Sequence, residues 1–293
     1  MMINILVTGS NGQLGNELRK LKSASPDFNF VFTDIAELDI TNPIAIEAIM
    51  KAEDIAVIIN CAAYTAVDKA EANKVAAYNI NTDAPGYLAA AAFKFNALLV
   101  QISTDYVFSG EGFRPYKEDF PCDPRSTYGT SKLQGELAVI NSGCRYVIIR
   151  TAWLYSAFGN NFIKTVRKYG RERGHLNMIY DQIGTPTHAA DLAGTILKVI
   201  TNSDDKKSNI YHYTNEGVCS WYDFALEILS QSGIACTVSP INTEEYPLPA
   251  VRPYYSVLNK GKIKHDLGIT IPHWKDSLIR CLKELELIET TVI

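Results

Sequence analysis

Short runs of apolar residues recur through the first half of the chain, and a longer segment with helical spacing follows each of them. The runs are almost continuously apolar rather than alternating, which is typical of parallel strands that are covered on both faces. Strands and helices in alternation predict an α/β fold with a doubly wound parallel sheet, the Rossmann type. The predicted strands are residues 3–8, 28–33, 55–60, 97–102 and 145–151.

Breakers and caps indicate the remaining elements. We expect Pro85 to interrupt a long alanine-rich helix over 75–95 near its start, because proline lacks an amide donor. Residues 239–253 are rich in proline, glutamate and tyrosine, so they predict an irregular loop. Further helices are predicted to begin near Pro43 and to cover residues 16–21, 188–200, 220–229 and 274–287, with a short strand over 211–213.

The composition limits the classes of function. The 293 residues carry a formal net charge of −4, which argues against a general nucleic-acid-binding surface. The six cysteines lack a C-x-x-C pair and the five histidines are equally dispersed, so we expect free thiols and no metal site. No apolar stretch reaches the length of a membrane span and no cleavable leader is visible, so a cytoplasmic protein is expected.

The turn after the first strand carries glycines in a G-x-x-G-x-x-G pattern, at Gly9, Gly12 and Gly15. Such glycines let the chain turn sharply, and they let backbone N–H groups approach a pyrophosphate at the start of the next helix. The second strand ends in Asp34, about 20 residues after the last glycine, where an acidic residue typically binds an adenosine ribose. Together these features predict a dinucleotide-binding site.

The sequence leaves the choice between NADH and NADPH open. Asp34 would accept hydrogen bonds from both ribose hydroxyls and repel a 2′-phosphate, and no arginine follows it within the turn, which favours NADH. Arg19 and Lys20 on the first helix could still reach a 2′-phosphate. Asp39 could bind the adenine amino group or simply lie at the entry of the next helix, and both interpretations stand.

Small and polar residues follow the third and fourth strands, at the sheet edge where ligands bind in this class of fold. Ala62 and Ala63 would let a nucleotide lie against the backbone, or they pack tightly against a neighbour. Thr104 comes just after the fourth strand, and Tyr128 and Lys132 lie four residues apart, on one face of a helix. Their hydroxyl, phenol and ammonium are the groups that reduction of a carbonyl by a nicotinamide requires.

With motifs elsewhere in the chain, these residues resemble the extended short-chain dehydrogenase/reductase family, and within it the dTDP-4-dehydrorhamnose reductases. The resemblance covers nearly the whole chain. One departure is Ser109, where the family often has aspartate, at a position without a catalytic role. The motifs that carry the resemblance are residues 12–15, 61–68, 103–108, 128–133, 150–155, 181–187 and 252–253.

The resemblance implies a role for each matching position. Tyr128 would protonate the oxygen at sugar C4, Lys132 would hold the nicotinamide ribose and lower the pKa of the tyrosine, and Thr104 would hydrogen-bond the same oxygen. The candidate cofactor-binding residues are Gly9, Asn11, Gly12, Gln13, Leu14, Asp34, Asp39, Ile40, Ala62, Ala63, Tyr64, Asn79, Tyr128 and Lys132. The candidate substrate-binding residues are Thr104, Asp105, Tyr106, Trp153, Asn161, Gln182 and Arg252.

The implied reaction is reduction of the C4 keto group of dTDP-4-dehydro-6-deoxy-L-mannose with NADPH or NADH, which gives dTDP-L-rhamnose. The related 4,6-dehydratases carry Thr-Asp-Glu where this chain has Tyr106 in third place, so elimination of water is not expected. Three alternatives stay open: a reductase of another nucleotide-linked 4-keto sugar, a sugar 4-epimerase, and a non-catalytic subunit resembling the regulatory subunit of methionine adenosyltransferase.

We expect the chain to be organised in two parts. Residues 1–151, with a returning segment at about 188–213, would form the NAD(P)-binding Rossmann domain. Residues 152–187 and 214–293 would form a smaller C-terminal α/β subdomain that binds the sugar nucleotide. The expected partners are this small molecule and a second copy of the chain in a homodimer, without nucleic acid or membrane.

Overall fold

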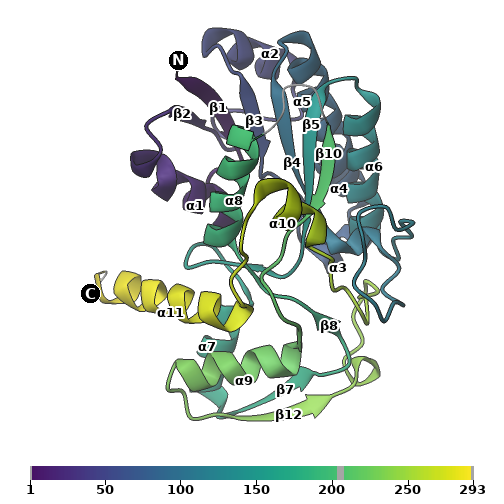
Figure 1. The fold of residues 1–293 in the computed structure, drawn as a ribbon. Helices are drawn as coiled ribbons and strands as arrows, with labels where there is room; N and C mark the ends of the chain where they lie inside the picture. Colours follow the sequence, from purple (N-terminus) through teal and green to yellow (C-terminus); the bar gives the residue numbers. More distant parts are fainter. Residues whose placement is uncertain (1, 203–207, 292–293) are drawn as a thin grey trace.

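A six-stranded parallel sheet forms the centre of the computed structural model, which describes residues 2–202 and 208–291 (Figure 1). Its strands lie in the order β10-β5-β4-β3-β1-β2, and every neighbouring pair is parallel. The predicted doubly wound α/β fold is confirmed. The strands are β1 (Ile3–Thr8), β2 (Phe28–Phe32), β3 (Val57–Asn60), β4 (Leu98–Thr104), β5 (Arg145–Thr151) and β10 (Asn209–His212).

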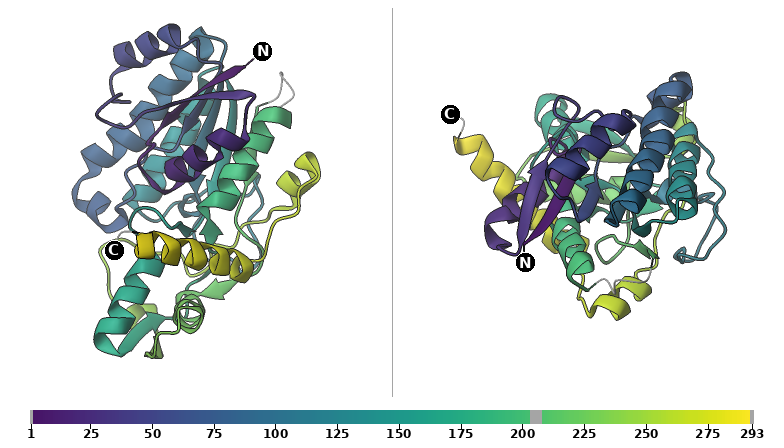
Figure 2. Two further views of the ribbon diagram at one scale, coloured as in Figure 1. Left: turned by 90° about the vertical axis from the view of Figure 1, so that its left-hand side faces the viewer. Right: turned by 90° about the horizontal axis from the view of Figure 1, so that it is seen from above.

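Helices cover both faces of this sheet (Figure 2). Successive strand residues point to opposite faces, so Ile5 and Val7 enter one core while Leu6 enters the other. Burial on both sides explains why the strand segments are continuously apolar. The covering helices are α1 (Gln13–Leu21) and α8 (Ala189–Asn202) on one face, and α2 (Pro43–Ala52), α5 (Ala84–Lys94) and α6 (Thr127–Asn141) on the other.

The strand order creates a crevice at one edge of the sheet. β2 lies on one side of β1 and β3 on the other, so the connections diverge between β1 and β3. Ligands of doubly wound sheets bind at the carboxyl ends of the strands, at such a switch point. The segments that follow β1, β3, β4 and β5 therefore meet around one crevice.

The helix predicted over 75–95 is interrupted near its start, but the interruption comes just before Pro85 rather than at it. The segment contains α4 (Lys74–Tyr78), a π-helical turn (Asn79–Asp83) and then α5. Pro85 lies in the first turn of α5, where an amide donor has no intrahelical partner to lose. The break is thus a wide turn within continuous helical structure, a feature that often marks functional sites.

A smaller α/β layer lies below the large sheet in Figure 1. Its strands β7 and β12 pair in parallel, and α7 and α9 pack against each other beside them. Phe224, Trp274 and Leu278 lie at the centre of its core. The elements of this layer are α7 (Phe162–Arg173), β7 (His175–Ile179), α9 (Trp221–Gln231), β12 (Thr237–Ile241) and α11 (Trp274–Thr291).

The loop predicted over 239–253 is wrong at its start, because its first three residues belong to β12. Pro240 lies within this two-stranded pairing, where an edge strand tolerates a missing amide. Ile263 and Ile271, which the sequence analysis places in the second part, pack in the core of the large sheet. No helix in the described ranges is long and apolar enough to cross a membrane.

The remaining elements are short and lie between these helices and strands along the chain. They are α3 (Val67–Ala72), β6 (Leu154–Tyr155), β8 (Ile183–Gly184), β9 (Thr187–His188), β11 (Cys219–Ser220), α10 (Gly261–Leu267) and the 3-10 turns Lys22–Ala24, Asp105–Val107 and Thr243–Glu245.

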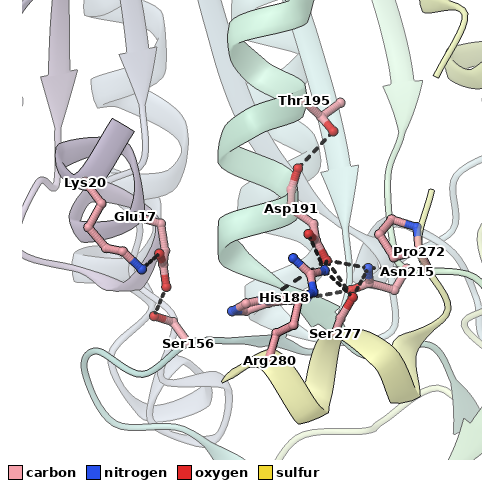
Figure 3. A network of polar contacts seen from close by, with 10 residues as sticks. All are labelled: Glu17, Lys20, Ser156, His188, Asp191, Thr195, Asn215, Pro272, Ser277 and Arg280. Carbon is pink, nitrogen blue, oxygen red and sulfur yellow. Dashed lines mark hydrogen bonds and ion pairs between the residues drawn. The ribbon is translucent and has the colours of Figure 1, made fainter. Parts of the chain in front are cut away.

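Polar contacts between α8 and α11 join the layers (Figure 3). The carboxylate of Asp191 on α8 accepts hydrogen bonds from Arg280 at 2.6 and 2.7 Å, from Ser277 at 2.6 Å and from Asn215 at 2.8 Å. Burial alone would raise the pKa of Asp191, but these hydrogen bonds outweigh it and hold the pKa below its ordinary value. The folded protein therefore favours the ionised carboxylate.

A second polar group links α1 to α11, and Figure 3 shows its α1 side, where Lys20 and Ser156 both contact Glu17. The ammonium of Lys20 lies 3.1 Å from Glu17 and 2.5 Å from Glu284. Within the described residues, the side chains of Glu17, His188 and Glu284 bring potential metal-ligand atoms within 4.8 Å of one another. Burial lowers the pKa of His188 to about 4, so this ring is neutral and Lys20 supplies the positive charge for the two carboxylates.

We predict that Asp191→Asn lowers the free energy of unfolding by about 1–3 kcal/mol, because Arg280 loses its ionic partner and the buried hydrogen bonds weaken. Urea denaturation measures this loss. The pKa of Asp191 is depressed in the folded state, so its contribution is present above the ordinary aspartate pKa and disappears as the pH falls through the folded value.

The matched control is Glu47→Gln, which breaks an exposed ion pair with Lys94 and should change the unfolding free energy by less than about 0.5 kcal/mol. Equal losses in the two variants would contradict the prediction.

Candidate active site

A cavity of about 950 Å³ opens at the carboxyl ends of the large sheet. It is lined by the glycine turn after β1, by the segments after β3, β4 and β5, and by side chains of α6 and α9. Most of the predicted cofactor-binding positions line it, together with Thr104, Tyr106, Tyr128, Lys132 and Trp153. The structure thus brings the predicted cofactor and reaction groups together in one place.

The backbone of the glycine turn has the shape that a pyrophosphate requires. Gly9 has a φ of +63°, and a Cβ there would lie 2.7 Å from the backbone of Ala62. A side chain at Gly15 would overlap the backbone of Ser10. Gly12 precedes α1 without a side-chain cap, so the first amides of the helix are available to an anion in the cavity. These observations fit a bound dinucleotide.

The two acidic residues predicted to contact the adenosine, Asp34 and Asp39, both line the cavity. Asp34 accepts hydrogen bonds from the amides of Asn11 at 3.0 Å and Ile35 at 2.9 Å. Asp39 accepts bonds from the amide and the hydroxyl of Thr41, which lower its pKa. Asp39 therefore shapes its own turn and also lines the cavity, so the two interpretations of this residue are compatible.

Tyr128 and Lys132 lie on α6, whose first turn is capped by Ser126. The Lys132 ammonium donates a hydrogen bond of 2.7 Å to the carbonyl oxygen of Ile102 in β4. Burial lowers the pKa of Lys132 to about 8, although Glu136 and Cys61 oppose this shift. The lysine is therefore anchored at the sheet and faces the cavity.

The expectation that Lys132 lowers the pKa of Tyr128 is wrong for the protein as it stands. Burial raises the pKa of Tyr128 to about 12, the Thr104 hydroxyl opposes the rise, and Asp105 adds to it. Lys132 is not among the groups that shift this pKa, so burial of the phenol sets the direction of the shift. Tyr128 thus holds its proton throughout the neutral range.

A run of buried hydrogen bonds crosses the sheet beneath these groups. The Thr8 hydroxyl donates to Asn60 at 2.6 Å, the Asn60 amide to Gln101 at 2.8 Å, and the Gln101 amide to the Ile102 carbonyl at 2.9 Å. This is the carbonyl that also receives the bond from Lys132. The run fixes the strand beside the glycine turn relative to α6.

A buried ion pair holds α6 one turn after Lys132. Glu136, one turn after Lys132, accepts hydrogen bonds from Arg150 of β5 at 2.7, 3.0 and 3.2 Å, and also one from the Ser103 hydroxyl. Both charged side chains are almost fully buried. The pair sets the position of α6 on β4 and β5, and so the position of its tyrosine and lysine.

Two of the predicted substrate-binding residues adjoin Thr104. Asp105 is buried and accepts a hydrogen bond of 3.0 Å from the Thr104 hydroxyl. The Tyr106 ring packs edge-on against Tyr128, with centroids 5.5 Å apart. Tyr106 takes the third place of the motif, where elimination of water is expected to need an acid. Burial raises the pKa of Tyr106 above its ordinary value.

Trp153 extends from the end of β5 into the cavity with a left-handed backbone, φ +48°. Its ring stacks on Trp221 of α9 at 3.6 Å, and a Cβ on Gly184 would come within 2.7 Å of it. Sequence reasoning missed Trp221. Its only signal is its place directly after the capping residue Ser220.

Four of the predicted residues that do not line the cavity have other structural contacts. Asn161 caps α7 and donates to the side chain of Gln13 at 3.1 Å. Gln182 is buried and donates to Thr243. Arg252 forms a bidentate pair with Asp68 at 2.6 and 2.9 Å. The main chain of Tyr64 is held by Asn81.

Asn81 is a second residue that sequence reasoning missed. It lies in the π-helical turn, and its side-chain amide bonds both main-chain groups of Tyr64 and the hydroxyl of Ser131 on α6. It therefore joins the segment after β3 to α6. Asn79, two residues earlier, lines the cavity.

Comparison with known proteins gives one consistent family. The family model described as the RmlD substrate binding domain matches residues 2–287. A dTDP-4-dehydrorhamnose reductase of Aggregatibacter actinomycetemcomitans is 37% identical over 286 residues, covering 94% of this chain and 97% of the relative.

Solved structures agree with this result. A dTDP-4-dehydrorhamnose reductase of Clostridium acetobutylicum is 46% identical with a TM-score of 0.92, and the match covers 97% of this chain and all of that one. The reductase of Bacillus anthracis, solved in complex with NADP, is 38% identical with a TM-score of 0.93 and the same coverage.

We predict that Gly9→Ala weakens NADPH binding by about tenfold or more, because the left-handed backbone and the contact with Ala62 both oppose a Cβ. Fluorescence titration with NADPH measures the dissociation constant. The matched control is Gly194→Ala on α8, where a Cβ meets nothing within 4 Å. That variant should bind as the wild type does and gain up to about 1 kcal/mol in stability. Equal affinity in all three proteins would refute the role of the turn.

Proposed function

The chain belongs to the family described as the RmlD substrate binding domain, and we propose on this premise that it reduces the C4 keto group of a dTDP-linked sugar. The substrate is dTDP-4-dehydro-6-deoxy-L-mannose, the reductant is NADPH or NADH, and the product is dTDP-L-rhamnose. The observation that carries this function is the convergence of Thr104, Tyr128 and Lys132 on the cavity behind the glycine turn.

We propose the following roles for the three residues. Bound NADPH or NADH would supply a hydride for the C4 carbon. Tyr128 donates its phenolic proton to the C4 oxygen, so that the carbonyl becomes a hydroxyl. Lys132, held at the Ile102 carbonyl, stabilises the phenolate that this transfer leaves. Thr104 orients the same oxygen with its hydroxyl.

The cofactor would lie along the glycine turn, with its diphosphate at the start of α1 and its adenosine near Asp34 and Asp39. The uncapped helix end, the φ of Gly9 and the small residues after β3 support this placement. We propose that the other cofactor-binding candidates from the sequence also contact the cofactor. They are Asn11, Gly12, Gln13, Leu14, Ile40, Ala62, Ala63, Tyr64 and Asn79.

The sugar nucleotide would lie against Trp153 and Trp221, where the two layers meet. Their stacked rings offer an apolar face to a sugar, and Arg252 lies close enough to Tyr106 to influence its ionisation. We assign the two expected parts of the chain accordingly, the large sheet to the cofactor and the smaller layer to the sugar. The homodimer and the cytoplasmic location stay predictions from the sequence.

We predict that Tyr128→Phe lowers kcat for this substrate by about a hundredfold or more, because the variant has no proton to donate. The assay follows the loss of reduced-nicotinamide absorbance with NADPH and with NADH. The affinity for NADPH should stay within about threefold of the wild type, since the ring and its packing remain. Tyr87→Phe, at an exposed tyrosine of α5, serves as the matched control and should keep full activity.

Two results would contradict the proposed function. Wild-type protein that binds NADPH, oxidises none with this substrate and co-purifies with a second subunit would favour a regulatory protein. Turnover of this substrate that survives in Tyr128→Phe would remove the tyrosine from its role.

A further inference from the structure

We propose that Asp105 controls the single hydroxyl proton of Thr104, and so decides whether Thr104 can donate a hydrogen bond to the C4 oxygen. This inference rests on the proposed reduction and assigns Asp105 as a positioning residue within it. Its basis is the set of hydrogen bonds around Thr104 and the burial of the Asp105 carboxyl.

The Thr104 hydroxyl lies against the phenol of Tyr128, whose pKa it lowers, and its other hydrogen bonds are to the two residues that follow it. The Thr104 oxygen accepts a bond from the Tyr106 amide at 3.2 Å and donates its proton to Asp105 Oδ1 at 3.0 Å. A hydroxyl has one proton and two acceptor positions. A carbonyl oxygen can only accept, so Thr104 has nothing to offer it while an ionised Asp105 holds that proton.

Protonation of Asp105 reverses this limit. A neutral carboxyl can donate to the Thr104 oxygen, and in any case it accepts more weakly than a carboxylate. Thr104 would then accept from Tyr106 and Asp105 and turn its own proton towards the cavity. No proton is consumed in this rearrangement, since the one on Asp105 stays in place while Tyr128 supplies the proton for the product.

The surroundings of Asp105 favour its neutral form. The side chain is 2% exposed, and Oδ2 is buried without a hydrogen-bond partner in the described part of the chain. Burial raises the pKa of Asp105 to about 6, against the opposing effect of the Ser256 and Thr104 hydroxyls and of two backbone amides. The Ser256 hydroxyl makes no well-formed bond to Oδ2.

The titratable groups that face Asp105 do not hold it ionised. The charge of Asp105 raises the pKa of both Tyr106 and Tyr128, and both phenols stay protonated in the neutral range. The charge of the Arg252 guanidinium lowers the pKa of Tyr106, but this guanidinium is already paired with Asp68. Since a bound substrate displaces water from the cavity, it would favour the neutral carboxyl still more.

The first experiment compares the pH dependence of reduction in the wild type and in Asp105→Asn. In the wild type, kcat/KM should fall by about tenfold per pH unit above the pKa of Asp105, and kcat should show the same limb at higher pH. The asparagine amide can donate permanently to Thr104, so the variant should retain turnover and lose the limb. The variant Thr104→Ser keeps the hydroxyl and should therefore keep the fall in kcat/KM at high pH.

A matched control is Asp266→Asn, whose carboxyl accepts from Tyr211 far from the cavity. It should show the wild-type pH profile. A limb that persists unchanged in Asp105→Asn would overturn the proposal, because the titration would then belong to another group.

A second measurement does not depend on turnover. Infrared difference spectra between the wild type and Asp105→Asn, recorded across the pH range, follow the carboxyl stretch of Asp105 directly. A protonated band that disappears in the range of the kinetic limb supports the inference, and a carboxyl that stays ionised down to the ordinary aspartate range overturns it. Wild-type protein without any turnover would refute the proposed function, while the infrared result would still decide the state of Asp105.

Discussion

The carbonyl oxygen of Ile102 accepts hydrogen bonds from the Gln101 side chain and from the Lys132 ammonium, and both parts of the site depend on this junction. A buried ammonium without such an acceptor would lose its proton or leave the interior. Gln101 in turn holds Asn60, and Asn60 holds Thr8 beside the glycine turn. One run of hydrogen bonds through the sheet therefore sets the distance between the place for a diphosphate and the place for proton transfer.

The ion pair between Glu136 and Arg150 also positions α6 on the sheet, at an energetic cost. Removing two charges from water costs several kcal/mol, and a well-packed apolar pair of similar volume is often as stable. The Glu136 carboxylate also accepts a hydrogen bond from Ser103, the neighbour of Thr104, and it raises the pKa of Lys132 against the effect of burial. We interpret the pair as a means of fixing where α6 lies on the sheet, which apolar contacts alone would leave less directional.

Local patterns were sufficient to predict the parallel strands, the glycine turn and the spacing of Tyr128 and Lys132, because each depends on neighbours in sequence. The roles of Asn81 and Trp221 could not be predicted, since each acts through a contact with a distant segment. The sign of the pKa shift at Tyr128 was missed for a related reason. A four-residue spacing shows that a lysine is near, but it does not show that desolvation of the phenol raises the pKa of the tyrosine.

The left-handed backbone of Trp153 has a consequence for ligand affinity. A non-glycine residue in this conformation costs about 1–2 kcal/mol, and a glycine there would avoid the cost. The chain instead keeps an indole that is already stacked on Trp221 and confined by Gly184. The entropy of ordering this large side chain is therefore lost during folding rather than during binding, so a ligand meets a preorganised surface and keeps more of its interaction energy as affinity.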